Sequence, residues 1–169
     1  VVSADVAGVA STREIAAGLT YGLDKGIFCF GGNTGSGKTG VSNLISSSGV
    51  VASDTAAVAT AKDAGNDAGL TYGLDKGIVA YGVTSSATNT KNLNTGVQAS
   101  DSSTAASAKY AGAGAPYGGD KGIFCYGHNG SGFINTRNLI SNTGSTAANV
   151  SGAGTARYQL SGAGFSYSA

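Results

Sequence analysis

Several residue types that often carry chemistry are rare or missing in this chain. Its 169 residues include no tryptophan, no methionine, one proline, one histidine and two cysteines. A single histidine cannot build a His-rich metal cluster, and no Ser/His/Asp arrangement has a supporting spacing. We therefore interpret His128 as a loop residue. We predict no enzymatic activity, no cofactor and no catalytic, cofactor-binding or metal-binding residues.

Charge is also scarce, at 11% of residues with a formal net charge of +1. Disordered segments usually carry many charges, so the composition favours a folded chain. There is no Lys and Arg excess of the kind that binds nucleic acid. No apolar run approaches the roughly 18–20 residues that cross a bilayer, and no charged-then-apolar leader begins the chain. The sequence thus predicts no nucleic-acid partner, no membrane span and no signal peptide.

Glycine is abundant, with 29 residues, and Leu, Ile, Val and Phe are sparse. A large helical core is therefore not predicted, and no apolar stripe follows a 3.6-residue period. Closely spaced turns require Gly and Asn, which this chain supplies throughout. The composition predicts an all-β fold.

An internal repeat organises the sequence. The motif Tyr-Gly-x-Asp-Lys-Gly-Ile begins at Tyr21, Tyr72 and Tyr117, which are 51 and 45 residues apart. A period of about 48 residues is typical of propeller blades. A second element places an acid or amide eight residues before a base, in the pairs Asp5 and Arg13, Asp54 and Lys62, Asp101 and Lys109, and Asn149 and Arg157.

Each copy continues with features that predict short strands and turns. The sequence matches are the apolar stretches starting at Ile27, Ile78 and Ile123, the pairs Asn43-Leu44, Asn92-Leu93 and Asn138-Leu139, and the turn glycines Gly49, Gly96 and Gly144. We predict one repeat domain over residues 1–169, a β-propeller of four-stranded units at 1–49, 50–96 and 97–144 with a partial unit at 145–169.

The stretch Ile27 to Phe30 indicates how such units pack. On a strand, Ile27 and Cys29 face one way while Phe28 and Phe30 face the other, and neither face is polar. This pattern predicts burial on both sides, between neighbouring blades. If their rings are fully buried, replacing Phe28 or Phe124 by Ala costs about 3–5 kcal/mol.

About three and a half units are fewer than the roughly 4–8 blades that close a propeller. Three arrangements remain open: part of a longer propeller, several chains completing one ring, or an open arc. We favour the first two, because an open arc exposes sheet faces and edges.

The period, the Tyr-Gly-x-Asp-Lys-Gly-Ile-Phe unit and Thr155-Ala156-Arg157-Tyr158 resemble kelch-type propeller repeats. They are similar to the Gly/Ser/Thr-rich repeats in tail and other structural proteins of bacteriophages, including cyanophages. The usual kelch unit has a double glycine and a spaced Tyr and Trp, whereas Gly31-Gly32 occurs in one copy here. The resemblance implies a structural or binding module of a virion, used in assembly or host attachment, with no catalytic residues.

One stretch matches a nucleotide-binding motif. Residues 32–39 fit the phosphate-binding loop Gly-x-x-x-x-Gly-Lys-Thr. That chemistry needs a helix after the loop, whose N-terminus faces the anion. The residues that follow, from Val41 to Gly49, are rich in β-branched and turn types, and the other copies lack Gly-Lys-Thr. We interpret the stretch as a turn between strands and keep nucleotide binding as the least favoured function.

The repeated charges and tyrosines have structural interpretations. Asp24, Asp75 and Asp120 are predicted to cap turns, and the repeated bases to pair with acids between strands, with ligand contact as the alternative. Cys29 and Cys125 share one small site, filled by Ala80 in the second copy, so we expect free thiols rather than a disulfide or metal site. The tyrosines expected to fill blade interfaces are Tyr21, Tyr72, Tyr110, Tyr117 and Tyr158.

The sequence favours a non-enzymatic structural module of a virion, whose partners are other copies of itself or other virion proteins. The main alternative is a secreted or surface lectin of the same architecture that binds cell-surface glycans. Repeated loop Tyr and Asn residues support it, because rings stack on sugar faces and amides bond hydroxyls.

Overall fold

The computed structural model describes residues 7–33, 37–62, 67–81, 87–152 and 154–164. Within these ranges the regular structure is twelve β-strands, and no residue is helical. The prediction of an all-β chain is confirmed.

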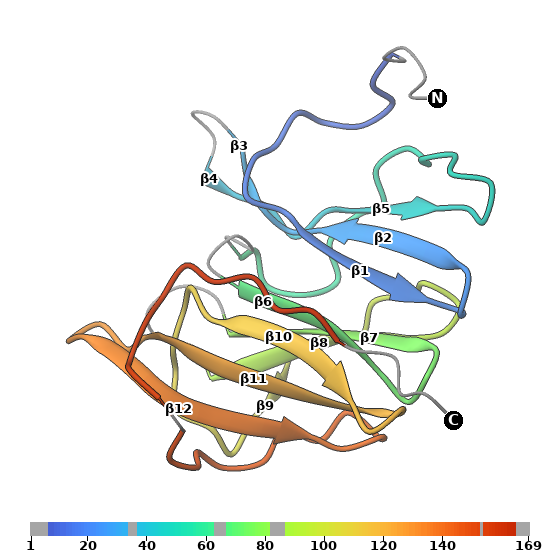
Figure 1. The fold of residues 1–169 in the computed structure, drawn as a ribbon. Helices are drawn as coiled ribbons and strands as arrows, with labels where there is room; N and C mark the ends of the chain where they lie inside the picture. Colours follow the sequence, from blue (N-terminus) through green and yellow to red (C-terminus); the bar gives the residue numbers. More distant parts are fainter. Residues whose placement is uncertain (1–6, 34–36, 63–66, 82–86, 153, 165–169) are drawn as a thin grey trace, which may run out of the picture.

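Three antiparallel sheets follow one another along the chain (Figure 1), and we call them units 1, 2 and 3. Unit 1 contains β1 (Ala17–Tyr21), β2 (Lys25–Cys29) and β5 (Ser42–Ile45). Unit 2 contains β6 (Asp67–Tyr72), β7 (Lys76–Tyr81), β8 (Thr88–Asn92) and β9 (Ser102–Ser103). Unit 3 contains β10 (Ala113–Tyr117), β11 (Lys121–His128) and β12 (Phe133–Ile140). A small hairpin of β3 (Gly32–Asn33) and β4 (Gly37–Lys38) follows β2.

A fourth extended segment lies along the third strand of each unit. In unit 2 it is β9, which pairs with β8. In the other units it is held by isolated bridges, Ile45 to Val51 and Ser42 to Thr55 in unit 1, and Ile140 to Thr146 and Arg137 to Val150 in unit 3. The strand orders are linear, so none of the described sheets closes on itself.

The register of the first two strands is the same in every unit. Gly18 pairs with Phe28, Gly69 with Val79, and Gly114 with Phe124. The Tyr-Gly-x-Asp-Lys motif forms the turn between these two strands, as its repetition predicts.

The pairing of the third strand in unit 2 shows that one match made from the sequence is wrong. Asn43 and Asn138 pair with Phe28 and Phe124, but the equivalent partner of Val79 is Thr90. Asn92 instead pairs with Gly77, the position that Ile45 and Ile140 hold in the other units. Matching Asn92-Leu93 to the other Asn-Leu pairs is therefore wrong by two residues. The turn glycine marks the register. Gly49, Gly96 and Gly144 each lie four residues after the residue that holds this position, which is Ile45, Asn92 or Ile140.

The prediction for Ile27 to Phe30 is also corrected. Regular β2 ends at Cys29, and Phe30 has a φ of 63°. This left-handed residue breaks the strand alternation, so Phe30 joins Ile27 and Cys29 in one buried cluster. Phe28 is 45% exposed on the opposite face. Burial on both faces holds in unit 2, where Ile78, Val79 and Ala80 are fully buried.

The units stack side by side, with β6 in contact with both β1 and β10 (Figure 1). Two apolar clusters lie between them. One joins unit 1 to Val79 of unit 2, and the other joins unit 2 to Phe124 and Ile140 of unit 3. The core of the chain is thus made at the junctions between units.

Candidate assembly interface between repeat units

Each junction contains a side chain from the middle strand of the later unit. Val79 of β7 packs into the unit 1 cluster, and Phe124 of β11 packs into the unit 2 cluster. The Phe124 ring meets Tyr81 nearly edge-on, with ring centroids 5.6 Å apart and an interplanar angle of 78°. This is a favourable aromatic geometry, and it adds to the burial of apolar area.

A second contact repeats at the turn glycines. A Cβ at Gly96 would lie 3.0 Å from Tyr21 Cε2 and 2.7 Å from Leu44 Cδ2 of unit 1. A Cβ at Gly144 would lie 2.7 Å from Tyr72 Cζ of unit 2. Both glycines also have φ near +80°, at +83° and +75°, where other residues are strained. The turn of one unit is therefore fitted against the tyrosine of the unit before it.

The predicted interface role of the tyrosines is confirmed at these two places. Tyr21 and Tyr72 are 4% and 2% exposed. Backbone hydrogen bonds reinforce the same contact, because Gly22 N–H donates to the Asp75 carbonyl and Gly73 N–H to the Asp120 carbonyl, both at 2.7 Å. Tyr117 is 38% exposed and fills no junction between the described units. Tyr158 is 39% exposed and stacks on Phe133 of unit 3, with centroids 4.4 Å apart.

Three of the four repeated bases lie over an aromatic ring of the preceding unit, and the fourth, Arg13, donates to the Val41 carbonyl at 2.8 Å. The base-to-ring-centroid distances are 4.8 Å for Lys62 over Phe30, 4.9 Å for Lys109 over Tyr81, and 5.2 Å for Arg157 over Tyr126. Phe30, Tyr81 and Tyr126 all have φ between 63° and 73°. The regular spacing of the bases is thus explained by a cation–π contact at each boundary.

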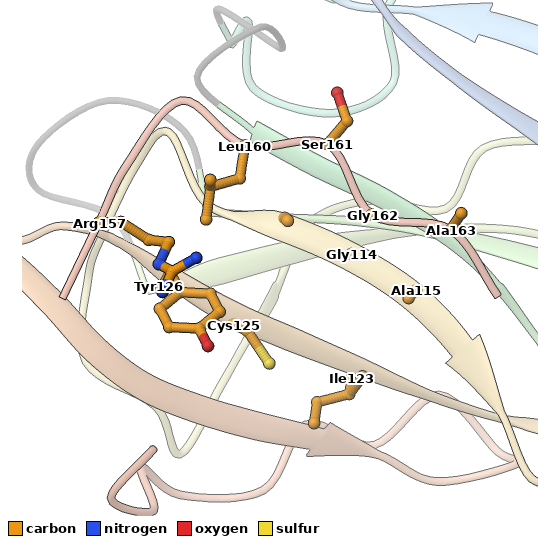
Figure 2. A pocket seen from close by; sticks show the side chains of 11 residues that line it. Gly114, Ala115, Ile123, Cys125, Tyr126, Arg157, Leu160, Ser161, Gly162 and Ala163 are labelled. Atoms are coloured by element: carbon orange, nitrogen blue, oxygen red, sulfur yellow. The ribbon is translucent and has the colours of Figure 1, made fainter. Parts of the chain in front are cut away.

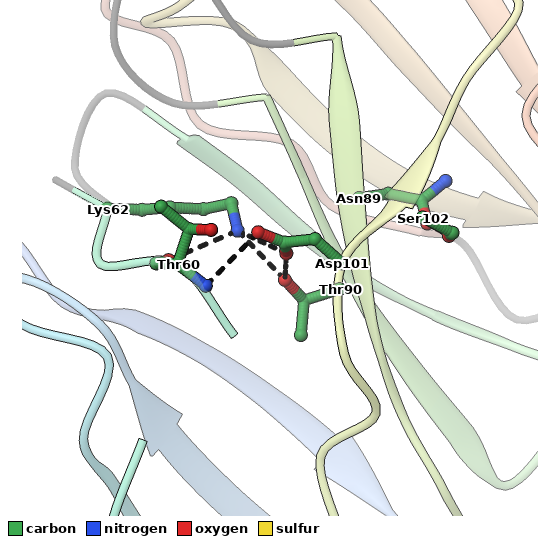
Figure 3. A network of polar contacts seen from close by, with 6 residues as sticks. All are labelled: Thr60, Lys62, Asn89, Thr90, Asp101 and Ser102. Atoms are coloured by element: carbon green, nitrogen blue, oxygen red, sulfur yellow. Dashed lines mark hydrogen bonds and ion pairs between the residues drawn. The ribbon is translucent and has the colours of Figure 1, made fainter. Parts of the chain in front are cut away.

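Lys62 also makes a polar network with unit 2 (Figure 3). Its Nζ donates to Asp101 Oδ1 at 2.6 Å and to Thr90 Oγ1 at 3.0 Å. Burial alone would raise the pKa of Asp101, but hydrogen bonds from Lys62, Thr90 and Thr60 outweigh it and lower that pKa. The predicted pairing of bases with acids is confirmed here. The acid comes from the next copy of the eight-residue element, since Asp54 instead bonds Ser11 and Asn43.

Lys109 occupies the equivalent place in unit 3 with a different partner. Its Nζ donates to Asn138 Oδ1 at 2.7 Å, and Asn149 stands where unit 2 has Asp101. Lys109 is 2% exposed. Burial lowers its pKa to about 8, partly opposed by the nearby Cys125. Among the described residues, Lys109 is the one base whose pKa is strongly shifted.

The Asp-Lys turns are local structures. Asp24, Asp75 and Asp120 each pair with the lysine that follows. The adjacent lysine lowers the pKa of Asp24 and of Asp75, and Asn142 most strongly lowers that of Asp120. Side-chain amides add to two of these carboxylates, because Asn94 Nδ2 donates to Asp75 and Asn142 Nδ2 donates to Asp120, each at 3.1 Å.

The position that holds Cys29, Ala80 or Cys125 is buried in units 1 and 2 and partly exposed in unit 3. Cys29 and Ala80 are fully buried, whereas Cys125 is partly exposed. Neither cysteine forms a disulfide in the part of the chain that the structure describes. Burial raises the pKa of the Cys125 thiol, which disfavours a reactive thiolate.

The motif at residues 32–39 lies partly outside the described residues, because 34–36 are not among them. Gly32 pairs with Lys38 in the β3–β4 hairpin, and the next regular element is strand β5. The helix that a phosphate-binding loop requires is therefore not found after Thr39.

His128 lies at the end of β11, where its Nδ1 accepts a hydrogen bond from Gly130 N–H. Among the described residues, no group of three or more His, Cys, Asp or Glu side chains is arranged to hold a metal ion. The same residues contain no helix long and apolar enough to span a membrane.

A cavity of about 260 Å³ lies on the far side of unit 3, under the C-terminal residues 157–163 (Figure 2). Ile123, Cys125 and Tyr126 of β11 line its floor, and Arg157 and Leu160 lie at its edge. At the inner junctions the corresponding space is filled by Val79 or Phe124.

Comparison with known protein families and with curated proteins finds no match to this chain.

Proposed function

We propose that this protein is a non-enzymatic structural module of a virion, a tail or other structural component used in assembly or host attachment. In this proposal the stacked units are blades of a kelch-like β-propeller, and the partners are further copies of the chain or other virion proteins. The proposal rests on the phage-type resemblance of the repeats and on the contacts between units.

The observation that carries the proposal is the repetition of the buried chemistry. Lys62 and Lys109 each lie over a ring of the preceding unit, with a base–ring distance near 4.9 Å. These two repeated bases thus serve the stacking of units, whereas the Asp-Lys pairs are local to each turn. A scaffold built this way leaves its loops and outer faces for contacts with partners.

Antibodies against the protein test this function. If it is a virion component, immunogold electron microscopy should label purified virus particles at a fixed place. Labelling confined to a cellular surface, with bare particles, would contradict a virion role and favour the lectin.

A second candidate, an extracellular lectin, is favoured by one group of side chains in unit 3. Phe133 and Tyr158 stack with centroids 4.4 Å apart and an interplanar angle of 10°. Both rings are exposed, at 55% and 39%, and His128 lies beside them. Exposed aromatic rings with neighbouring polar side chains offer a stacking surface for a sugar ring.

A glycan array measures this alternative directly. The lectin hypothesis predicts selective glycan binding that is lost in Phe133→Ala and kept in Leu93→Ala, a matched exposed position elsewhere. Binding to no glycan, or equal binding by both variants, would exclude a role for these rings.

A further inference from the structure

The far side of unit 3 presents the residues that are buried at the inner junctions. We define the outer face of unit 3 as Tyr117, Ile123, Cys125, Tyr126 and Leu139. Each is partly or largely exposed. The counterparts of the first four in units 1 and 2, which a following unit covers, are buried: Ile27, Ile78, Cys29, Ala80, Phe30, Tyr81, Tyr21 and Tyr72. Leu44, the counterpart of Leu139 in unit 1, is partly buried against the junction cluster.

The turn of unit 3 shows the same difference. A Cβ at Gly22 would lie 2.9 Å from the Asn94 carbonyl oxygen, and a Cβ at Gly73 would lie 2.8 Å from that of Asn142. At Gly118, the equivalent position, no described atom lies within 4 Å. The turn that covers Gly22 and Gly73 thus has no described counterpart on unit 3.

The far side of unit 1 presents the residues that insert into the preceding unit at the inner junctions. We define the outer face of unit 1 as Gly26, Phe28 and Gly49. The Phe28 ring lies over Gly18 of its own unit, at 3.2 Å from a Cβ there, as Phe124 lies over Gly114 at 2.9 Å. Phe28 is 45% exposed and Phe124 is fully buried. The Phe28 ring therefore lies on its own sheet as the Phe124 ring does, but no described unit covers it and it is exposed to solvent.

Neither glycine of the outer face of unit 1 meets a preceding unit among the described residues. A Cβ at Gly77 would meet Leu19, and one at Gly122 would meet Leu70, each from the preceding unit. A Cβ at Gly26 would instead lie 3.1 Å from Ile45 Cδ1 of the same unit. A Cβ at Gly49 would have no described atom within 4 Å, whereas one at Gly96 or Gly144 would touch a tyrosine of the preceding unit.

We propose that the outer face of unit 3 docks the outer face of unit 1 of a second copy of this chain. Phe28 of the second copy enters the cavity above Ile123 and Cys125. Gly49 of that copy lies between Tyr117 and Leu139, as Gly96 lies between Tyr21 and Leu44. This inference deepens the proposed structural function and rests on it, since it names one surface through which such a module assembles.

Residues 157–163 lie in the way of this docking. A Cβ at Gly162 would lie 2.3 Å from the Gly114 carbonyl oxygen, so the segment lies beside β10 as β10 lies beside β6 (Figure 2). It forms no described strand and is mostly exposed. In the docking copy, β1 is already held in its own sheet by five residue pairs with β2. Docking replaces the segment with β1 of the second copy.

The interface joins two different surfaces, so two copies joined by one such contact each keep one unused face. Such a head-to-tail contact gives a closed ring where the rotation closes and a filament where it does not. Two copies contain six units, within the roughly 4–8 that close a propeller, so a dimer in which both contacts form is the smallest closed ring.

Analytical ultracentrifugation of the purified chain over a concentration series tests the proposal. The unaltered chain, of 16.3 kDa, should form species of two or more copies. Phe28→Asp and Leu139→Asp, one on each face, should each weaken association at least about tenfold. Both positions are exposed, and circular dichroism checks that both variants fold. Leu74→Asp, at a 62% exposed position in the turn of unit 2, should assemble normally.

Mixing the two variants gives the decisive result. Phe28→Asp keeps its unit 3 face, and Leu139→Asp keeps its unit 1 face. An equimolar mixture should therefore form a heterodimer and nothing larger. A monomeric unaltered chain, or two folded variants that assemble as well as Leu74→Asp, would overturn the inference. Particle labelling with a monomeric chain would sink the interface alone, whereas assembly without particle labelling would sink the virion role alone.

Discussion

Phe28 and Phe124 occupy the same position in two copies of one strand, within the shared tetrapeptide Gly-Ile-Phe-Cys. Both rings lie over the glycine that pairs with them in the neighbouring strand. Phe28 is nevertheless 45% exposed, and Phe124 is fully buried. Local sequence and local structure agree, so neither explains the difference in burial.

The difference comes from the neighbouring unit. Phe124 inserts between Ile78, Ala80 and Tyr81 of unit 2, and Phe28 has no described unit before it. A single unit is a thin sheet that cannot bury either of its faces alone. As in other repeat proteins, stability therefore resides largely in the contacts between neighbours.

The largest expected effect is at the filled junction. Phe124→Ala should lower the free energy of unfolding by about 3–5 kcal/mol, because it leaves a cavity beside Tyr81. Urea denaturation followed by tyrosine fluorescence measures this. A loss below about 1 kcal/mol would mean that the ring contributes little to the junction.

A smaller loss is expected when the buried ion pair loses one partner. Asp101→Ala leaves the Lys62 ammonium, whose side chain is 5% exposed, without its carboxylate. Because Thr90 and the Thr60 carbonyl still accept hydrogen bonds from it, we expect a loss of about 2 kcal/mol. Ser103→Ala, an exposed neighbour in β9, is the control. Equal stability of both variants would contradict the network.

The two lysine sites also differ in how they respond to pH. Burial lowers the pKa of Lys109 from 10.5 to about 8, so above pH 8 the unfolded chain binds more protons there than the folded chain. The free energy of unfolding should therefore rise with pH, by about 1 kcal/mol between pH 8 and 9. Cys125 and Tyr81 have raised pKa values and act in the opposite direction at higher pH.

Lys109→Met is the control for this pH dependence, because it keeps the length and removes the titrating group. The rise in stability between pH 8 and 9 should vanish in this variant, as measured by urea denaturation at each pH. A rise of the same size in Lys109→Met would assign the effect to another group.

The smallest effect is expected at the open tyrosine. Tyr117 is 38% exposed and Tyr72 is 2% exposed, at equivalent positions. Tyr117→Ala should change the unfolding free energy of the isolated chain by less than about 0.5 kcal/mol, whereas Tyr72→Ala should cost several times more. Similar melting temperatures for the two variants would remove the distinction between filled and open contacts.

Much of the fold could be predicted from repetition and turn chemistry. Three copies of one motif place the turn between the first two strands, and Gly49, Gly96 and Gly144 mark the next turn. The register of β8 could not be read in the same way, because Asn92 resembles Asn43 in type. Its position is fixed by its distance from Gly96.

The site was harder to predict because its contacts join different copies. The eight-residue spacing suggests that Asp54 and Lys62 belong together, yet Lys62 pairs with Asp101, 39 residues later. The left-handed φ of Phe30 reverses a side-chain direction that strand alternation predicts. The sequence showed that a base and an aromatic residue recur in each copy. Their contact joins two different copies, so it depends on how the units stack.

The central claim is that burial depends on the neighbouring unit rather than on the strand itself. Urea denaturation of Phe28→Ala and Phe124→Ala, side by side at a concentration where the chain is monomeric, tests it most directly. We predict that Phe124→Ala is less stable than Phe28→Ala by about 3 kcal/mol or more. Equal losses in the two variants would contradict the claim.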